Sequence, residues 1–135
     1  MSAAIVQGVM GTTLDVDFWI DLPARQYMRV QNIARSLGGT VGANTVVYAP
    51  DGTPVNFIFG GLAGLGSFKE ESKHTRKMLF RGKKIPVLRL ERILKSKETL
   101  RRDKDLLHIL HIRELLRCQR ALKSKGSKAR QLKKP

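Results

Sequence analysis

The sequence predicts a mixed α/β (α+β) fold: a small mixed β-sheet flanked by helices, with a further helix at the C-terminus. Three observations predict it. Residues 12–20 (TTLDVDFWI) alternate between apolar and polar side chains as a strand does, and residues 22–37 repeat apolar side chains at helical spacing. Two β-rich runs on either side of Asp51-Gly52 have the pattern of a hairpin. A chain of 135 residues has room for one such domain with a modest core.

Charge is the strongest signal in the composition. The net charge of +15 predicts a polyanionic partner such as RNA, DNA, nucleotide phosphates or an acidic protein. The single cysteine, Cys118, excludes an internal disulfide and a cysteine-based metal finger, which fits a reducing cytoplasm. No apolar run approaches the roughly 18 residues that span a bilayer, and the N-terminus lacks the pattern of a signal peptide. We therefore expect a soluble cytoplasmic protein with no membrane partner.

The predicted strand over residues 12–20 holds the main candidate site. Alternation places Asp15, Asp17 and Trp19 on one face, opposite a face that we expect to be buried and that contains Leu14, Val16, Phe18 and Ile20. Two carboxylates about 6.5 Å apart on such a strand repel each other, and a divalent cation such as Mg²⁺ relieves that repulsion. The alternative is a strand end that emerges into solvent, with both acids simply exposed.

The other elements follow in chain order. Residues 1–9 predict a helix beside the strand, ended by Gly8 and Gly11, and the helix over 22–37 ends at Gly38-Gly39. The first hairpin covers 45–49 and 54–59. The glycine-rich segment 60–67 is not a Walker loop, which leaves a mobile connection or a loop in contact with a ligand. A second hairpin over 77–80 and 85–88 has a basic turn, 81–84, that is either solvated surface or an anion-binding face.

Two helices are expected at the C-terminal end. In the first, about 90–100, Lys97 continues an apolar stripe, so that its ammonium either reaches the edge of the packing face or points into a cleft toward phosphate. The second runs from about Asp103 to Leu122 and places His108 and His111 three residues apart, which we interpret as surface or satisfied histidines. We therefore divide the chain into a domain, 1–122, and a disordered basic tail, 123–135, that adds either nucleic-acid affinity or solubility.

The order of these features resembles a known family. The chain is similar to the minimal nucleotidyltransferases of the DNA polymerase β superfamily, particularly the small bacterial group related to abortive-infection and toxin–antitoxin nucleotidyltransferases. The resemblance spans residues 1 to 116. It depends on segments 8–18 (GVMGTTLDVDF), 55–58 (VNFI), 86–94 (PVLRLERIL), Ser96-Lys97 and 102–106 (RDKDL).

The resemblance implies a function. Asp15 and Asp17 would bind Mg²⁺ that bridges the triphosphate of a nucleoside triphosphate, and Lys97 would contact phosphate as the third catalytic residue. A nucleotidyl group would pass to a hydroxyl acceptor, with RNA as one candidate, and a protein partner of the antitoxin kind would be expected. The remaining substrate-binding positions implied by the resemblance are Thr12, Thr13, Asn56, Arg102, Lys104 and Asp105.

Three positions depart from the family pattern. A Gly-Gly or Gly-Ser pair is expected at or before Met1, which implies a chain that begins late. Asn56 stands where the family has a third acid, and an amide cannot act as a base. Gly11 stands where many relatives have arginine. The alternatives are therefore a non-catalytic relative that binds nucleotide, RNA or protein, and an unrelated basic RNA- or ribosome-binding protein.

Overall fold

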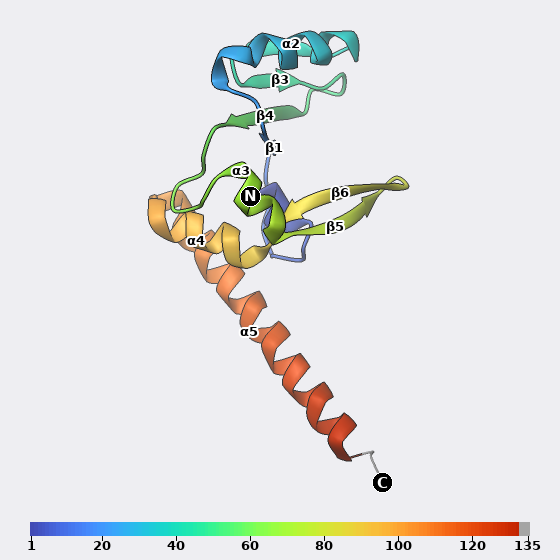
Figure 1. The fold of residues 1–135 in the computed structure, drawn as a ribbon, viewed down its shortest axis with the longest axis vertical. Helices are drawn as coiled ribbons and strands as arrows, with labels where there is room; N and C mark the ends of the chain where they lie inside the picture. The colour runs from blue at the N-terminus through green and yellow to red at the C-terminus, as the bar shows by residue number, and fades with distance from the viewer. Residues whose placement is uncertain (133–135) are drawn as a thin grey trace.

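A four-stranded mixed sheet forms one half of the molecule, as the sequence predicts. In this computed structural model, which describes residues 1–132, the strand order is β1-β4-β3-β2 (Figure 1). β1 and β4 are parallel, and the β4–β3 and β3–β2 pairs are antiparallel. The strands are β1 (Val16–Ile20), β2 (Thr40–Ala43), β3 (Val46–Tyr48) and β4 (Pro54–Phe59).

The turn between β3 and β4 confirms the first predicted hairpin. Gly52 has a φ of +85°, the backbone N–H of Ala49 donates to the carbonyl of Thr53, and the Asp51 carboxylate accepts from the Thr53 N–H. The short 3₁₀ helix η1 (Ala24–Gln26) leads into α2 (Tyr27–Ser36), which packs on β2 and β3. Gly39 follows α2 because a Cβ there would lie 2.7 Å from the Tyr48 carbonyl oxygen.

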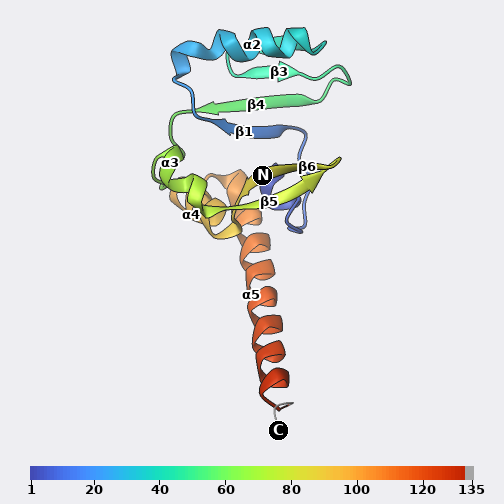
Figure 2. The same cartoon turned by 45° about the vertical axis from the view of Figure 1, so that its right-hand side comes forward.

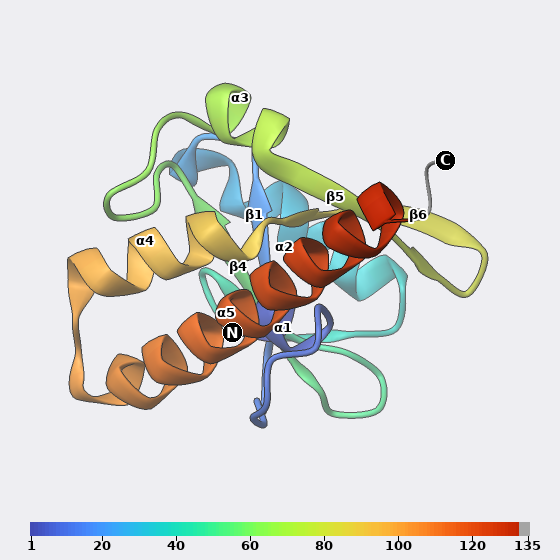
Figure 3. The same cartoon turned by 90° about the horizontal axis from the view of Figure 1, so that it is seen from below.

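A second unit begins after β4. Ser67 and Glu70 form a capping box at α3 (Phe68–Glu71), and η2 (Ser72–His74) leads into the second predicted hairpin, β5 (Thr75–Phe80) and β6 (Lys83–Leu88). Its turn residues Arg81 and Gly82 both have positive φ, at 47° and 79°, as the tight turns of hairpins require. The chain then forms α4 (Leu90–Leu100) and α5 (Asp103–Leu132), which pack against each other (Figure 3).

The buried core lies between the N-terminal helix and the last two helices. α1 (Ser2–Ile5) is shorter than the helix expected over residues 1–9. Its residue Ala4 packs with apolar side chains from the following turn and from α4 and α5. The buried members of this cluster are Ala4, Val9, Leu90, Ile112 and Leu116.

The predicted face of the first strand is not buried. β1 begins only at Val16, where its pairing with β4 begins, and Leu14 is 90% exposed in the segment before it. Phe18 is 41% exposed although its ring stacks on that of Phe57. Val16 and Ile20 on the same face are only half-buried, because the core cluster forms elsewhere, around α1, α4 and α5.

The final helix is longer than expected. α5 does not end near Leu122 but continues to Leu132 and projects from the body of the molecule (Figures 1 and 2). Residues 123–132 are thus helical in the segment where the sequence suggests a disordered tail, and residues 133–135 of that predicted tail lie outside the described part. No helix within residues 1–132 is both long and apolar enough to cross a membrane.

Candidate functional site

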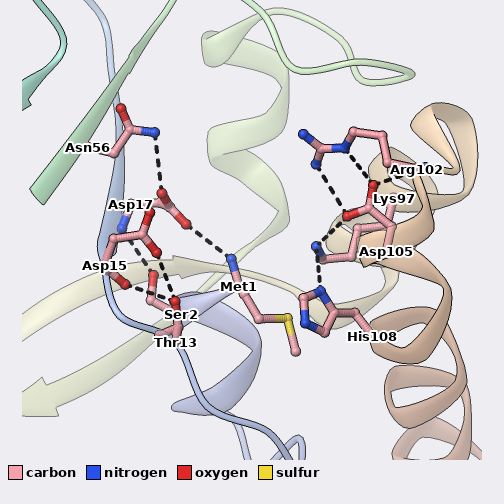
Figure 4. Close-up of polar contacts among 10 residues, drawn as sticks. All are labelled: Met1, Ser2, Thr13, Asp15, Asp17, Asn56, Lys97, Arg102, Asp105 and His108. Atoms are coloured by element: carbon pink, nitrogen blue, oxygen red, sulfur yellow. Dashed lines mark hydrogen bonds and ion pairs between the residues drawn. The ribbon is translucent and has the colours of Figure 1, made fainter. Parts of the chain in front are cut away.

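The parallel pairing of β1 and β4 places Asp17 directly opposite Asn56. The Asn56 amide nitrogen lies 3.5 Å from Oδ1 of Asp17, and the other carboxylate oxygen, Oδ2, lies 3.1 Å from the amino group of Met1 (Figure 4). The hydroxyl of Ser2 accepts a hydrogen bond from the backbone N–H of Asp17 at 3.1 Å. These contacts hold the start of α1 against β1 at Asp17, the candidate metal-binding residue.

Asp15 lies just before the strand. Its carboxylate accepts a hydrogen bond of 2.8 Å from the Thr13 hydroxyl, and the side chain is half-buried, as is that of Asp17. Thr12 is exposed and takes no part in these contacts. The structure thus brings Asp15, Asp17, Thr13 and Asn56 together at the start of β1 and leaves Thr12 at the surface.

A second cluster of charges forms where α4 turns into α5. Arg101, with φ of +47°, reverses the chain, so that Lys97 on the last turn of α4 meets Asp105 on the first turn of α5. The fully buried Asp105 carboxylate accepts from Lys97 Nζ at 3.1 Å and from Arg102 Nε at 2.7 Å. Burial alone raises the pKa of Asp105, but the hydrogen bonds from Arg102 and Lys97 outweigh it and hold that pKa well below its usual range. Lys104 is exposed and lies outside the cluster.

His108 extends the charge cluster toward the first one. Its Nδ1 lies 3.3 Å from Lys97 Nζ, which agrees with the interpretation of a satisfied histidine (Figure 4). Burial and the nearby positive charges of Lys97 and the Met1 amino group lower the pKa of His108. Because the same Met1 amino group contacts Asp17, the two clusters are neighbours. The sequence contains a usable signal for His108, since it follows Asp105 by three residues on one helix face.

Hydrogen bonds hold both ends of the glycine-rich segment, residues 60–67. The indole N–H of Trp19 donates to the Gly60 carbonyl, and the backbone N–H of Gly66 donates to the Glu71 carboxylate at 3.0 Å. Glu71 is buried and also accepts a 2.7 Å hydrogen bond from Arg92 on α4. This hydrogen bond lowers the pKa of Glu71 to about 2. The segment therefore connects the sheet to α4 as a structural element.

The oxygen donors around Asp17 are compatible with Mg²⁺. The carboxylates of Asp15 and Asp17 are hard ligands, and Mg²⁺ in nucleotide sites commonly takes one or two carboxylates and completes its shell with phosphates and water. Asn56 faces Asp17 with its amide nitrogen, so its side chain would have to turn over to offer its oxygen to a cation. Within residues 1–132 there is no group of three or more His, Cys, Asp or Glu side chains that could hold a metal by itself. Asp15 and Asp17 could hold Mg²⁺ only with water or other oxygen ligands completing its shell.

Comparisons of the chain with protein-family models, with curated proteins and with solved structures find no match. The interpretation of the site therefore depends on the geometry of its own residues.

Proposed function

We propose that this protein binds a Mg²⁺–nucleoside triphosphate at the start of β1 and transfers its nucleotidyl group to a hydroxyl acceptor. One observation supports this most: Asp17 lies in register with Asn56 on the neighbouring parallel strand, with Asp15 two residues before it. A pair of carboxylates at one end of a strand is suited to hold the cation of a triphosphate.

The surrounding residues supply complementary roles. Asp15 and Asp17 would hold Mg²⁺, which when bound neutralises charge on the phosphate oxygens. Lys97 and Arg102 offer N–H donors for phosphate, and Asp105 fixes the orientation of both. Asn56 can contact the cation through its oxygen but cannot remove a proton from the acceptor.

Calorimetric titration of nucleoside triphosphates with and without Mg²⁺ tests the site. In the double variant Asp15→Asn, Asp17→Asn we expect Mg²⁺-dependent binding to be lost, because both charged oxygen ligands become neutral amides of the same size. The matched control is Asp21→Asn, which removes an exposed carboxylate next to the end of the same strand and should leave binding unchanged. Unaltered binding by the double variant would show that the nucleotide site lies elsewhere.

A non-catalytic nucleotide-binding module is the second candidate, and Asn56 favours it. Its amide lies against Asp17 where a nucleotidyltransferase has a third acid. The variant Asn56→Asp separates the two functions, because it supplies the third acid that the resemblance implies and places a second carboxylate beside Asp17, where the Met1 amino group offsets only one charge. If the protein is an enzyme, the variant should gain thermal stability with Mg²⁺ more than the wild type does and should transfer labelled nucleotide at least as fast. Nucleotide binding without transfer by either protein would favour the module. A partner of the antitoxin kind remains a prediction from the resemblance.

A further inference from the structure

The part of α5 beyond the core forms a projecting basic rod, here called the α5 arm, residues 117–132. The apolar stripe of α5 ends at Leu116, and the positions that would continue it, Gln119, Arg120 and Lys123, are polar. The arm therefore has nothing to bury against the body and leaves it (Figure 2). All of its residues except Gln119 are exposed. It contains no acidic residue and six basic ones: Arg117, Arg120, Lys123, Lys125, Lys128 and Arg130.

The distribution of these charges favours a polyanion over a membrane or an apolar protein groove. At 3.6 residues per turn the six basic side chains cover an arc of roughly 220° around the helix. The remaining arc of roughly 140° contains Cys118, Gln119, Leu122, Gly126 and Ala129, of which only Leu122 is a large apolar side chain. Membrane-surface helices and helices that dock in protein grooves need a broad apolar face with large anchors. The arm has no such face.

The arm is also a helix under internal electrostatic strain. Arg120 and Lys123, and Lys125 and Lys128, are like-charged pairs three residues apart, and each pair weakens the helix. Arg117, at the start of the arm, is instead paired with Glu114. Gly126 lowers its helical propensity further. A bound chain of phosphates would offset the repulsion, so binding and helix stability are expected to reinforce each other.

We infer that the α5 arm binds the sugar–phosphate backbone of RNA and holds the acceptor of the proposed transfer. Arginine- and lysine-rich segments of marginal stability are typical of RNA-binding elements that become ordered on binding. The arm begins about 14 Å along the helix axis from His108, at 1.5 Å per residue, so RNA lying on it can reach the candidate site. The role of the RNA as acceptor rests on the proposed function, whereas the binding of RNA by the arm does not.

Fluorescence anisotropy with a labelled RNA hairpin of about 24 nucleotides tests the inference, with affinity followed against salt concentration. The arm variant removes four charges and keeps the full chain: Lys123→Gln, Lys125→Gln, Lys128→Gln and Arg130→Gln. The matched control removes four exposed charges from the β5–β6 hairpin: Arg76→Gln, Lys77→Gln, Lys83→Gln and Lys84→Gln.

The salt dependence gives the expected size of the effect. Four lost phosphate contacts should reduce the slope of log affinity against log salt by about 3, and affinity near 0.1 M salt should fall about hundredfold or more. The control should change both quantities far less. Equal losses in the two variants would mean attraction by net charge alone and would overturn the inference. Equal or tighter binding of duplex DNA of the same sequence, or equally effective competition by polyglutamate, would overturn the choice of RNA.

One further variant separates this inference from the proposed function. Asp15→Asn, Asp17→Asn should retain RNA binding even if it loses nucleotide binding. Loss of RNA binding in that variant would place the RNA site at β1 and refute the inference that the α5 arm binds RNA. Loss of RNA binding in the arm variant alone, with nucleotide binding intact, is the result that the inference predicts.

Discussion

Neutralising Asp105 is the sharpest test of how the C-terminal helices are held together. Asp105 is fully buried and accepts hydrogen bonds from Lys97 and from two nitrogen atoms of the Arg102 side chain, while the Lys97 side chain is only 12% exposed. Asp105→Asn keeps the size of the side chain but leaves the Lys97 ammonium buried without its counter-charge. Removing one partner of a buried ion pair costs about 3–5 kcal/mol, and the amide retains part of the hydrogen bonding, so we expect about 3 kcal/mol. For a chain of this length that corresponds to a fall in Tm of about 10 °C.

Urea denaturation followed by circular dichroism measures this loss. The matched control is Glu98→Gln, which neutralises the partner of Arg113 in a pair whose side chains are 56% and 38% exposed, and which should cost no more than about 1 kcal/mol. The double variant Lys97→Met, Asp105→Leu should recover most of the stability, because no unpaired charge remains buried. Similar losses below about 1 kcal/mol in Asp105→Asn and Glu98→Gln would refute the claim that burial makes this pair important.

Three further predictions concern the connections and the arm. Hydrogen bonding from Arg92 depresses the pKa of Glu71 to about 2, so its stabilisation is complete above its unfolded pKa near 4.5 and is lost as the pH falls through about 2. Glu71→Gln should therefore remove about 2 kcal/mol at neutral pH and flatten the acid limb of a pH–stability curve. Gly39→Ala should cost about 1–3 kcal/mol in urea denaturation, because its Cβ would meet the Tyr48 carbonyl oxygen at 2.7 Å and force the turn after α2 to move. Gly126→Ala, where a Cβ meets nothing within 4 Å, should increase helical ellipticity and leave the unfolding midpoint of the core unchanged.

Local signals were sufficient for much of the fold. The two hairpins and α2 are each encoded by residues close together in the chain. Turn residues such as Asp51-Gly52 mark the hairpins, and helical periodicity marks α2. The sequence does not indicate β2, because Thr40–Ala43 has only four residues, includes Gly42 and is defined by its pairing with β3 rather than by its own pattern. The sequence places the end of α5 too early for the opposite reason. Leu122 is already 70% exposed, and the loss of apolar residues shows where burial stops, not where the helix stops.

Burial was the least predictable property. Alternation in residues 12–20 correctly indicates a strand around Asp17 but cannot tell whether another layer will cover Leu14 and Phe18. That depends on where the C-terminal helices pack, and they form their core with Ala4 and Val9 instead. Packing between residues distant in the chain therefore decides whether Leu14 and Phe18 are buried.

The same limit applies to the candidate site. Asp17 and Asn56 are adjacent because β1 and β4 are parallel, which a sequence pattern does not specify without the resemblance. The Lys97–Asp105 pair, in contrast, depends only on a short turn between two helices that are neighbours in the chain, so the sequence can indicate it. Lys104 stands next to Asp105 in the same motif but faces solvent, because consecutive helical residues point in different directions.

Lys97 has a structural role, and its contacts bear on the phosphate-binding role that we propose for it. The sequence leaves two positions open for the Lys97 ammonium, at the edge of the packing face or in a cleft toward phosphate. In the structure the ammonium lies between Asp105 and His108. A lysine ammonium has three N–H donors, and these two contacts use two of them. A phosphate can therefore be bound by the third N–H without breaking the ion pair. If so, Asp105→Asn should weaken nucleotide binding even among molecules that remain folded, because it changes the direction of the donor as well as the stability of the helix pair. Nucleotide affinity that is unchanged after correction for the folded fraction would assign Lys97 to the fold alone.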